Sequence, residues 1–187
     1  MKVNPFSGTF LLPCLLLVLL VASCQKDVQS ETENVLSKTE LSQPTSAELS
    51  KMKKTDLLKA VRQATSRFHS TTQAKKHHYT PGVECVSAPG LGGMGYHWVN
   101  GGLVDATFDP LKPEAILYAK GPGGNLRLIA VEYIVLDMGQ PRPSFGSQLF
   151  DIGGTPLPLP HYSLHVWLYE PNPAGIFTPF NPNVSCN

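Results

Sequence analysis

The spacing of hydrophobic residues changes along the chain and divides it into four segments. An apolar run occupies residues 10 to 20, and a polar stretch from 25 to 44 holds only isolated aliphatic residues. Apolar positions then recur every three or four residues from 45 to 79, as in an amphipathic helix. From residue 80 to 187, short apolar runs alternate with proline and glycine clusters, which is typical of strands joined by turns. The pattern predicts an α+β domain preceded by two segments that do not belong to its core.

The helical segment, residues 45 to 79, has a predicted start and end. Thr45 and Glu48 have the spacing of a capping box. The helix should end before Pro81, because proline cannot continue it and the following glycine completes a turn signal. Its apolar stripe consists of Leu57, Val61, Ala64 and Phe68.

The β-rich part, residues 80 to 187, predicts at least four strands. Residues 115–119 and 126–136 form a hairpin around the glycine-rich stretch 121–125. The other two candidates are residues 95–100 and 162–169. The expected fold is α+β, with the N-terminal amphipathic helix packed on a small antiparallel β-sheet that carries long Pro/Gly-rich loops.

Residues 1–23 are predicted to be a lipoprotein signal peptide. The apolar run extended to Ser23 has about 14 residues, fewer than the ~20 that a membrane-spanning helix needs. Val21-Ala22-Ser23-Cys24 resembles the bacterial lipobox, which implies cleavage before Cys24 and acylation of that cysteine with fatty acids such as palmitate. Residues 24–44 would then be a flexible tether. The alternative is ordinary secretion with Cys24 as an incidental thiol. The first interpretation predicts a protein anchored to a membrane of the bacterial cell envelope, with its domain outside the cytoplasm.

Charge and composition exclude several classes of protein. The formal net charge of +1 lacks the electrostatic signature of nucleic-acid binding. The charge is unevenly distributed, with 10 basic and 6 acidic residues at positions 24–82 and 4 basic and 8 acidic residues at 83–187. This asymmetry is typical of a solvated basic helix beside a mildly acidic domain.

Two cysteines remain after removal of the signal peptide and acylation of Cys24. Cys85 and Cys186 are predicted to form a disulfide in an exported chain. The alternatives are a reactive thiol or a thiolate metal ligand, which require a lowered thiol pKa that the neighbouring Glu84 disfavours.

Five stretches within residues 79–186 resemble a family of exported bacterial proteins of uncharacterised function. They are GGMGYHWVN at 92–100, LVDATFDPLKPE at 103–114, LRLIAVEYIV at 126–135, HYSLHVWLYEPNPAGIF at 161–177 and NPNVSC at 181–186. The resemblance implies an exported domain and assigns no activity, cofactor or catalytic residue.

Glu132 is the most informative candidate for chemistry, because it interrupts a strand that is otherwise apolar on both faces. A buried carboxylate must be paired, bound to a metal or protonated. A structural partner such as Arg127 or a histidine is one interpretation. The other combines Glu132 with His97 and His165 in a site for a divalent transition metal such as iron, zinc or manganese.

His161 and His165 form an HxxxH pattern, which on a helix would place both rings beside one ion. In a strand, four residues span ~13 Å, so only one of them can join the site. His165 is the better candidate because it lies inside the predicted strand. The acids of the preceding loop, Asp105, Asp109 and Glu114, are expected to cap turns.

Three hypotheses follow for the function. The first is a lipid-anchored envelope protein that binds a small ligand or metal ion through His97, Glu132 and His165. The aromatic walls of this expected pocket are Tyr96, Trp98, Tyr162 and Trp167. The second is a metal-dependent enzyme that uses the same ligands. The third is a structural or partner-binding envelope module without metal, in which these residues form a buried polar network.

Overall fold

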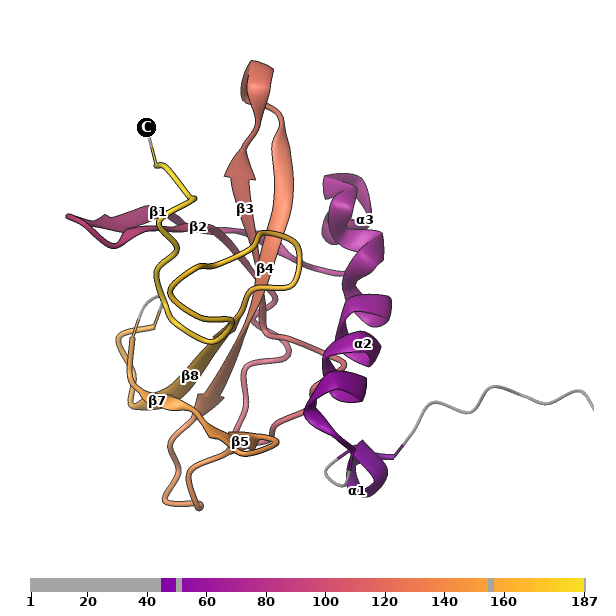
Figure 1. The fold of residues 1–187 in the computed structure, drawn as a ribbon. Helices are drawn as coiled ribbons and strands as arrows, with labels where there is room; N and C mark the ends of the chain where they lie inside the picture. The colour runs from indigo at the N-terminus through magenta and orange to yellow at the C-terminus, as the bar shows by residue number, and fades with distance from the viewer. Residues whose placement is uncertain (1–44, 50–51, 155–156, 187) are drawn as a thin grey trace, which may run out of the picture. The chain divides into compact units, whose positions relative to one another are not determined.

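The computed structural model describes residues 45–49, 52–154 and 157–186. The signal peptide, Cys24 and the tether predicted from the sequence lie outside the described residues. Helices and a curled antiparallel sheet make up the described part (Figure 1), which confirms the α+β class. None of the described helices has the length and hydrophobicity to cross a membrane.

The segment expected to form one helix is divided into four short elements. They are α1 (Ser46–Leu49), α2 (Lys54–Thr65), the 3-10 turn η1 (Ser66–His69) and α3 (Thr71–Lys76). The division coincides with hydroxyl groups that bond to the backbone. Thr65 Oγ1 donates to the carbonyl of Val61 at 2.8 Å, and Ser70 Oγ accepts from the Gln73 amide at 3.4 Å as the N-cap of α3.

Six strands form the main sheet, in the order β1-β2-β3-β4-β8-β7, and every neighbouring pair is antiparallel. Their bounds are β1 (Thr80–Ala88), β2 (Gly92–Val99), β3 (Ala115–Lys120), β4 (Leu126–Leu136), β7 (Asp151–Ile152) and β8 (His161–Val166). A separate hairpin consists of β5 (Ser144–Phe145) and β6 (Gln148–Leu149), and the turn η2 (Pro122–Gly124) joins β3 to β4. The predicted hairpin is confirmed as β3–β4.

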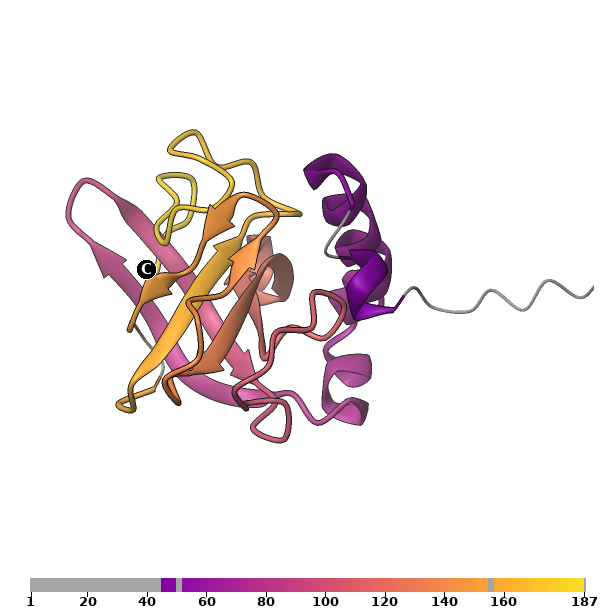
Figure 2. The same cartoon turned by 90° about the horizontal axis from the view of Figure 1, so that it is seen from below.

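Both faces of the central strands β3, β4 and β8 are buried. One face packs with Leu57, Val61 and Phe68 of the helical segment. Two tyrosine hydroxyls also form hydrogen bonds with backbone carbonyls of this segment. The Tyr118 hydroxyl donates to the carbonyl of Phe68 at 2.6 Å, and the Tyr169 hydroxyl donates to that of Arg62 at 2.9 Å. The other face packs with Trp167, Ile176 and Val184 of the C-terminal segment. Figures 1 and 2 show the helices beside the sheet and the C-terminal segment, in yellow, crossing it from another side.

A disulfide joins Cys85 of β1 to Cys186, with the two Cα atoms 5.3 Å apart. An isolated bridge between Gly93 and Asn181 binds the same C-terminal segment to β2. The end of the chain is therefore attached to the β1–β2 edge of the sheet by one covalent and one hydrogen-bonded contact.

Candidate metal centre

The strand register brings Glu132 and the two predicted histidines to one face of the sheet. Glu132 of β4 lies directly opposite His165 of β8. On the other side of β4, Glu132 pairs with Ala115 of β3, while His97 of β2 pairs with Leu117. Because paired residues and residues two apart point to the same face, His97 and Glu132 project together across β3.

Gly95 allows β2 to approach its neighbours two residues before His97. Its φ is +96°, and a Cβ atom at this position would lie 2.7 Å from the Tyr118 carbonyl oxygen and 2.8 Å from Cδ1 of Ile129. Only glycine accepts this backbone conformation without strain in so little space. The glycine thus helps to position the His97 imidazole.

The three side chains converge at close range. His97 Nε2 lies 3.3 Å from Glu132 Oε2, and His165 Nδ1 lies 3.7 Å from Glu132 Oε1. One potential ligand atom from each residue falls within 4.8 Å of the other two. A tetrahedral ion bound at about 2.1 Å separates its ligand atoms by roughly 3.4 Å. The two measured distances lie on either side of this value.

Burial shifts the pKa of all three groups toward their neutral forms. It lowers the pKa of His97 to about 4, although the Gly95 backbone acts weakly in the opposite direction. Burial, with a smaller contribution from His97, lowers the pKa of His165 to about 3. The pKa of Glu132 is raised, first by burial and then by the charge of Glu114. Both imidazoles are therefore neutral at pH 7, the form in which a ring nitrogen binds a metal ion.

The cluster has almost no hydrogen bonds to compensate for its burial. Glu132 and His97 are 0% exposed and His165 is 3% exposed. Both ring nitrogens of His97, both carboxylate oxygens of Glu132 and Nε2 of His165 form no hydrogen bond with any residue that the structure describes. Unsatisfied buried polar atoms are rare and costly. A metal ion would satisfy the atoms that converge, and two imidazoles with one carboxylate suit zinc, iron or manganese.

A cavity of about 180 Å³ reaches two of the three candidate ligands. Glu132 and His165 form part of its wall, together with Asp151, Ser163 and Met94. His97 is not part of the wall. A small molecule in this cavity would therefore meet the Glu132–His165 side of the cluster.

The other residues expected at the site are separated by strand alternation. Trp167 lies near His165, with ring centroids 6.3 Å apart and nearly parallel planes. Tyr96 and Trp98 flank His97 in β2 and therefore point to the opposite face, where they pack with the helix-side core. Tyr162 packs there as well. The structure does not bring the four aromatic residues together around the cluster.

The remaining candidates have other partners. His161 is buried, but its Nδ1 lies 2.6 Å from the Leu159 carbonyl and it does not belong to the metal-ligating group. Arg127 pairs with Glu170 rather than with Glu132.

Glu114 is a buried carboxyl group, although its place in the loop sequence predicted that it would cap a turn, as was also predicted for Asp105 and Asp109. Asp105 and Asp109 do accept hydrogen bonds from the amides two residues later, at 2.7 and 2.9 Å. Glu114 is only 2% exposed, and its Oε2 accepts from the Ile134 amide at 2.9 Å. Its position directly before the apolar run 115–119 was the available signal that it would be buried.

Replacing Glu114 by glutamine should change how stability depends on pH. Burial raises the pKa of Glu114 from 4.5 to about 8. Between these values the folded state keeps a proton that the unfolded state releases, so this group lowers stability as pH rises. Glutamine keeps the acceptor oxygen without titrating. We expect Glu114→Gln to match the parent near pH 4 and to exceed it at pH 8 by a few kcal/mol in urea unfolding. A difference that stays constant across this range would contradict the assignment.

Comparisons of the chain with protein-family models, curated proteins and solved structures found no match, so the functional argument rests on the geometry of this cluster.

Proposed function

We propose that this chain is a lipid-anchored protein of the bacterial cell envelope whose β domain binds a divalent transition metal ion through His97, Glu132 and His165. The observation that carries the metal proposal is the convergence of three buried ligand groups, in which both ring nitrogens of His97 and both carboxylate oxygens of Glu132 lack a hydrogen bond to the described residues. A purely structural network is disfavoured by the same observation, because buried networks are stabilising only when their members are satisfied.

The proposed location is supported by the sequence. The apolar run before Cys24 and the polar tether after it favour an acylated, tethered domain, as does the resemblance of residues 79–186 to exported proteins. The Cys85–Cys186 pair suits an oxidising compartment. In this proposal, the amphipathic helical segment and the Pro/Gly-rich loops cover a small sheet held outside the cytoplasm. Loss of the protein from the membrane fraction on Cys24→Ala substitution is the check of the anchor.

Metal-dependent catalysis is the second candidate, and the adjoining cavity favours it. Three protein ligands leave at least one coordination position for water or substrate. The cavity beside Glu132 and His165 could admit a small molecule to that position. A bound ion would supply Lewis acidity or an activated water there. Asp151 and Ser163 are polar residues of the cavity wall that could orient a substrate.

Metal content is the direct test of the proposal. We expect the mature chain, exported without acyl groups and purified without chelator, to contain close to one equivalent of zinc, iron or manganese. His97→Ala and His165→Ala should lose it. His161→Gln is a matched control, because His161 is a buried histidine of β8, the strand that also holds His165, and it lies outside the cluster.

Elemental analysis and circular dichroism of each variant provide the readout. A parent protein that remains without metal after incubation with each of the three ions would overturn the proposal. The same conclusion would follow if the folded His97→Ala variant bound as much metal as the control.

A further inference from the structure

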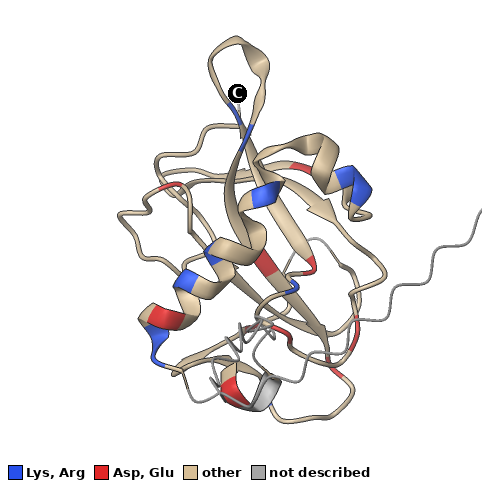
Figure 3. Cartoon of the chain, turned by 90° about the vertical axis from the view of Figure 1, so that its right-hand side faces the viewer, with Lys and Arg blue, Asp and Glu red and all other residues tan. Residues whose placement is uncertain are grey.

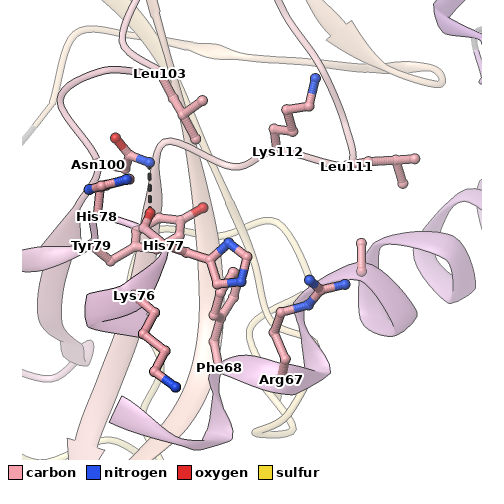
Figure 4. A pocket seen from close by; sticks show the side chains of 11 residues that line it. Arg67, Phe68, Lys76, His77, His78, Tyr79, Asn100, Leu103, Leu111 and Lys112 are labelled. Atoms are coloured by element: carbon pink, nitrogen blue, oxygen red, sulfur yellow. Dashed lines mark hydrogen bonds between the residues drawn. The ribbon is translucent and has the colours of Figure 1, made fainter. Parts of the chain in front are cut away.

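A second cavity lies on the helical side of the domain and shares no residue with the metal cluster. Its volume is about 360 Å³. It is lined by Ala64, Arg67, Phe68, Lys76, His77, His78, Tyr79, Asn100, Leu103, Leu111 and Lys112. These residues come from the end of α2, from η1, from the end of α3 and from the loop between β2 and β3 (Figure 4). We refer to this cavity as the basic pocket.

The ionisable side chains of the basic pocket include one arginine, two lysines and two histidines, and none of its described lining residues is an aspartate or a glutamate. Lys112 is partly neutralised by Asp109, with Nζ 3.0 Å from the carboxylate. Within the described ranges, neither Arg67 nor Lys76 pairs with a carboxylate. No carboxylate of the described residues therefore compensates the positive charges of Arg67 and Lys76.

These cations differ from others on the same helices. Basic residues recur along α2 and α3 (Figure 3), but three of them lie over aromatic rings. These contacts join Lys54 to Phe177, Arg62 to Tyr169 and Lys75 to Trp98. Arg67 and Lys76 have no such ring contact among the described residues. They are available to a ligand.

The floor of the basic pocket is apolar and well supported. Phe68 and Tyr79 are 6% and 3% exposed, and their rings meet edge to face at 4.9 Å. The Tyr79 hydroxyl donates to the Pro113 carbonyl at 2.6 Å. Asn100 Nδ2 donates to the His77 carbonyl at 3.0 Å, which connects the loop wall to the end of α3. The pocket thus combines a rigid hydrophobic floor with a charged rim.

The cationic groups lie on different parts of the rim. Figure 4 shows the Arg67 guanidinium beside the His77 ring, while the Lys76 side chain extends downward and the Lys112 side chain upward in this view. An arginine presents two parallel N–H groups to a phosphate or carboxylate, and a lysine adds a point charge. Because a phosphate monoester carries about −1.5 to −2 charges at neutral pH, it matches two uncompensated cations better than a single carboxylate does.

We propose that the basic pocket binds the phosphate group of a small organic phosphate through Arg67 and Lys76, with the carbon portion of the ligand resting on Phe68 and Tyr79. The phosphate could belong to a soluble phosphate monoester or to a phospholipid headgroup. Both sources present anionic phosphate oxygens, with up to two negative charges in a monoester and one in the phosphodiester of a phospholipid headgroup. This site is independent of the metal proposal, since the two clusters have no residue in common.

Glycerol 3-phosphate is the soluble probe, and its binding is measured by NMR titration of the mature chain without acyl groups. We expect saturable binding with a dissociation constant of roughly 1 mM or below. Arg67→Gln and Lys76→Gln should each weaken it about tenfold or more, the loss expected for a charge-assisted contact. Lys59→Gln removes an exposed cation of α2 outside the pocket and should leave the affinity unchanged.

Vesicles of phosphatidylglycerol mixed with phosphatidylcholine test the headgroup source by co-sedimentation. If glycerol 3-phosphate does not bind, but vesicle binding falls with Arg67→Gln and not with Lys59→Gln, the ligand is a lipid headgroup. The proposal is overturned if neither probe binds. It is also overturned if Lys59→Gln weakens binding as much as Arg67→Gln, because the interaction would then be a general charge effect.

Discussion

Replacing both Cys85 and Cys186 by serine is expected to lower the free energy of unfolding by about 4 to 5 kcal/mol. The disulfide closes a loop with a sequence separation of 101 residues. In the chain-entropy treatment, a cross-link of this length removes that much conformational free energy from the unfolded chain. Since single domains have only about 5 to 15 kcal/mol of stability, the loss is a large fraction of the total.

Urea unfolding with and without reductant measures this effect. Reductant should destabilise the parent protein. It should leave the stability of the Cys85→Ser/Cys186→Ser variant unchanged, so the variant is the control for any other effect of the reductant. A parent protein whose midpoint moves by less than the equivalent of about 1 kcal/mol would show that the disulfide does not constrain the unfolded state as expected.

The structure also indicates which part of the domain should lose stability first when the disulfide is reduced. Among the described strands, β1 lies at the edge of the sheet and pairs with β2, and their register shifts at three positions. The disulfide attaches this edge to the C-terminal segment. Amide hydrogen exchange in the reduced protein should therefore increase in β1 and residues 181–186 before it increases in β4.

The central hairpin could be predicted from the sequence because its strands are buried on both faces. β3 and β4 consist of nearly continuous apolar runs, and the turn between them is rich in glycine. β1 could not be predicted in this way, since most of its residues are exposed or half-buried and its irregular register leaves no alternating pattern. Strand alternation is a signal only where one face meets a core.

The structure brings the predicted metal ligands together but does not place the predicted aromatic residues around them, and strand geometry explains both results. Glu132 and His165 were selected as polar residues inside strands, and the register then placed them in the same pair. Tyr96 and Trp98, two of the predicted aromatic walls, are adjacent to His97 in sequence. In a strand, adjacent residues point to opposite faces. The Tyr96 and Trp98 rings therefore lie on the face of the sheet opposite to the one that carries His97 and Glu132.

Glu132→Gln is expected to have opposite effects on stability with and without metal. In the metal-free protein, burial raises the pKa of Glu132, whereas the unfolded chain ionises near 4.5. This carboxyl group therefore opposes folding at pH 7, because the folded state must bind a proton or bury a charge. Glutamine has nearly the same shape and removes that requirement. The metal-free variant should be more stable than the metal-free parent by about 1 to 3 kcal/mol.

With metal present, the order should reverse. An ion that binds only the folded state stabilises the parent by about 4 kcal/mol at a free concentration of 1,000 times its dissociation constant. Glutamine offers a neutral amide in place of the carboxylate, so the variant should gain little. Thermal and urea unfolding in chelator and in saturating zinc would measure both differences. A purely structural role for the His97–Glu132–His165 cluster predicts instead that the substitution changes stability equally in both conditions. The reversal of sign therefore distinguishes a metal centre from a buried polar network, even if every variant folds.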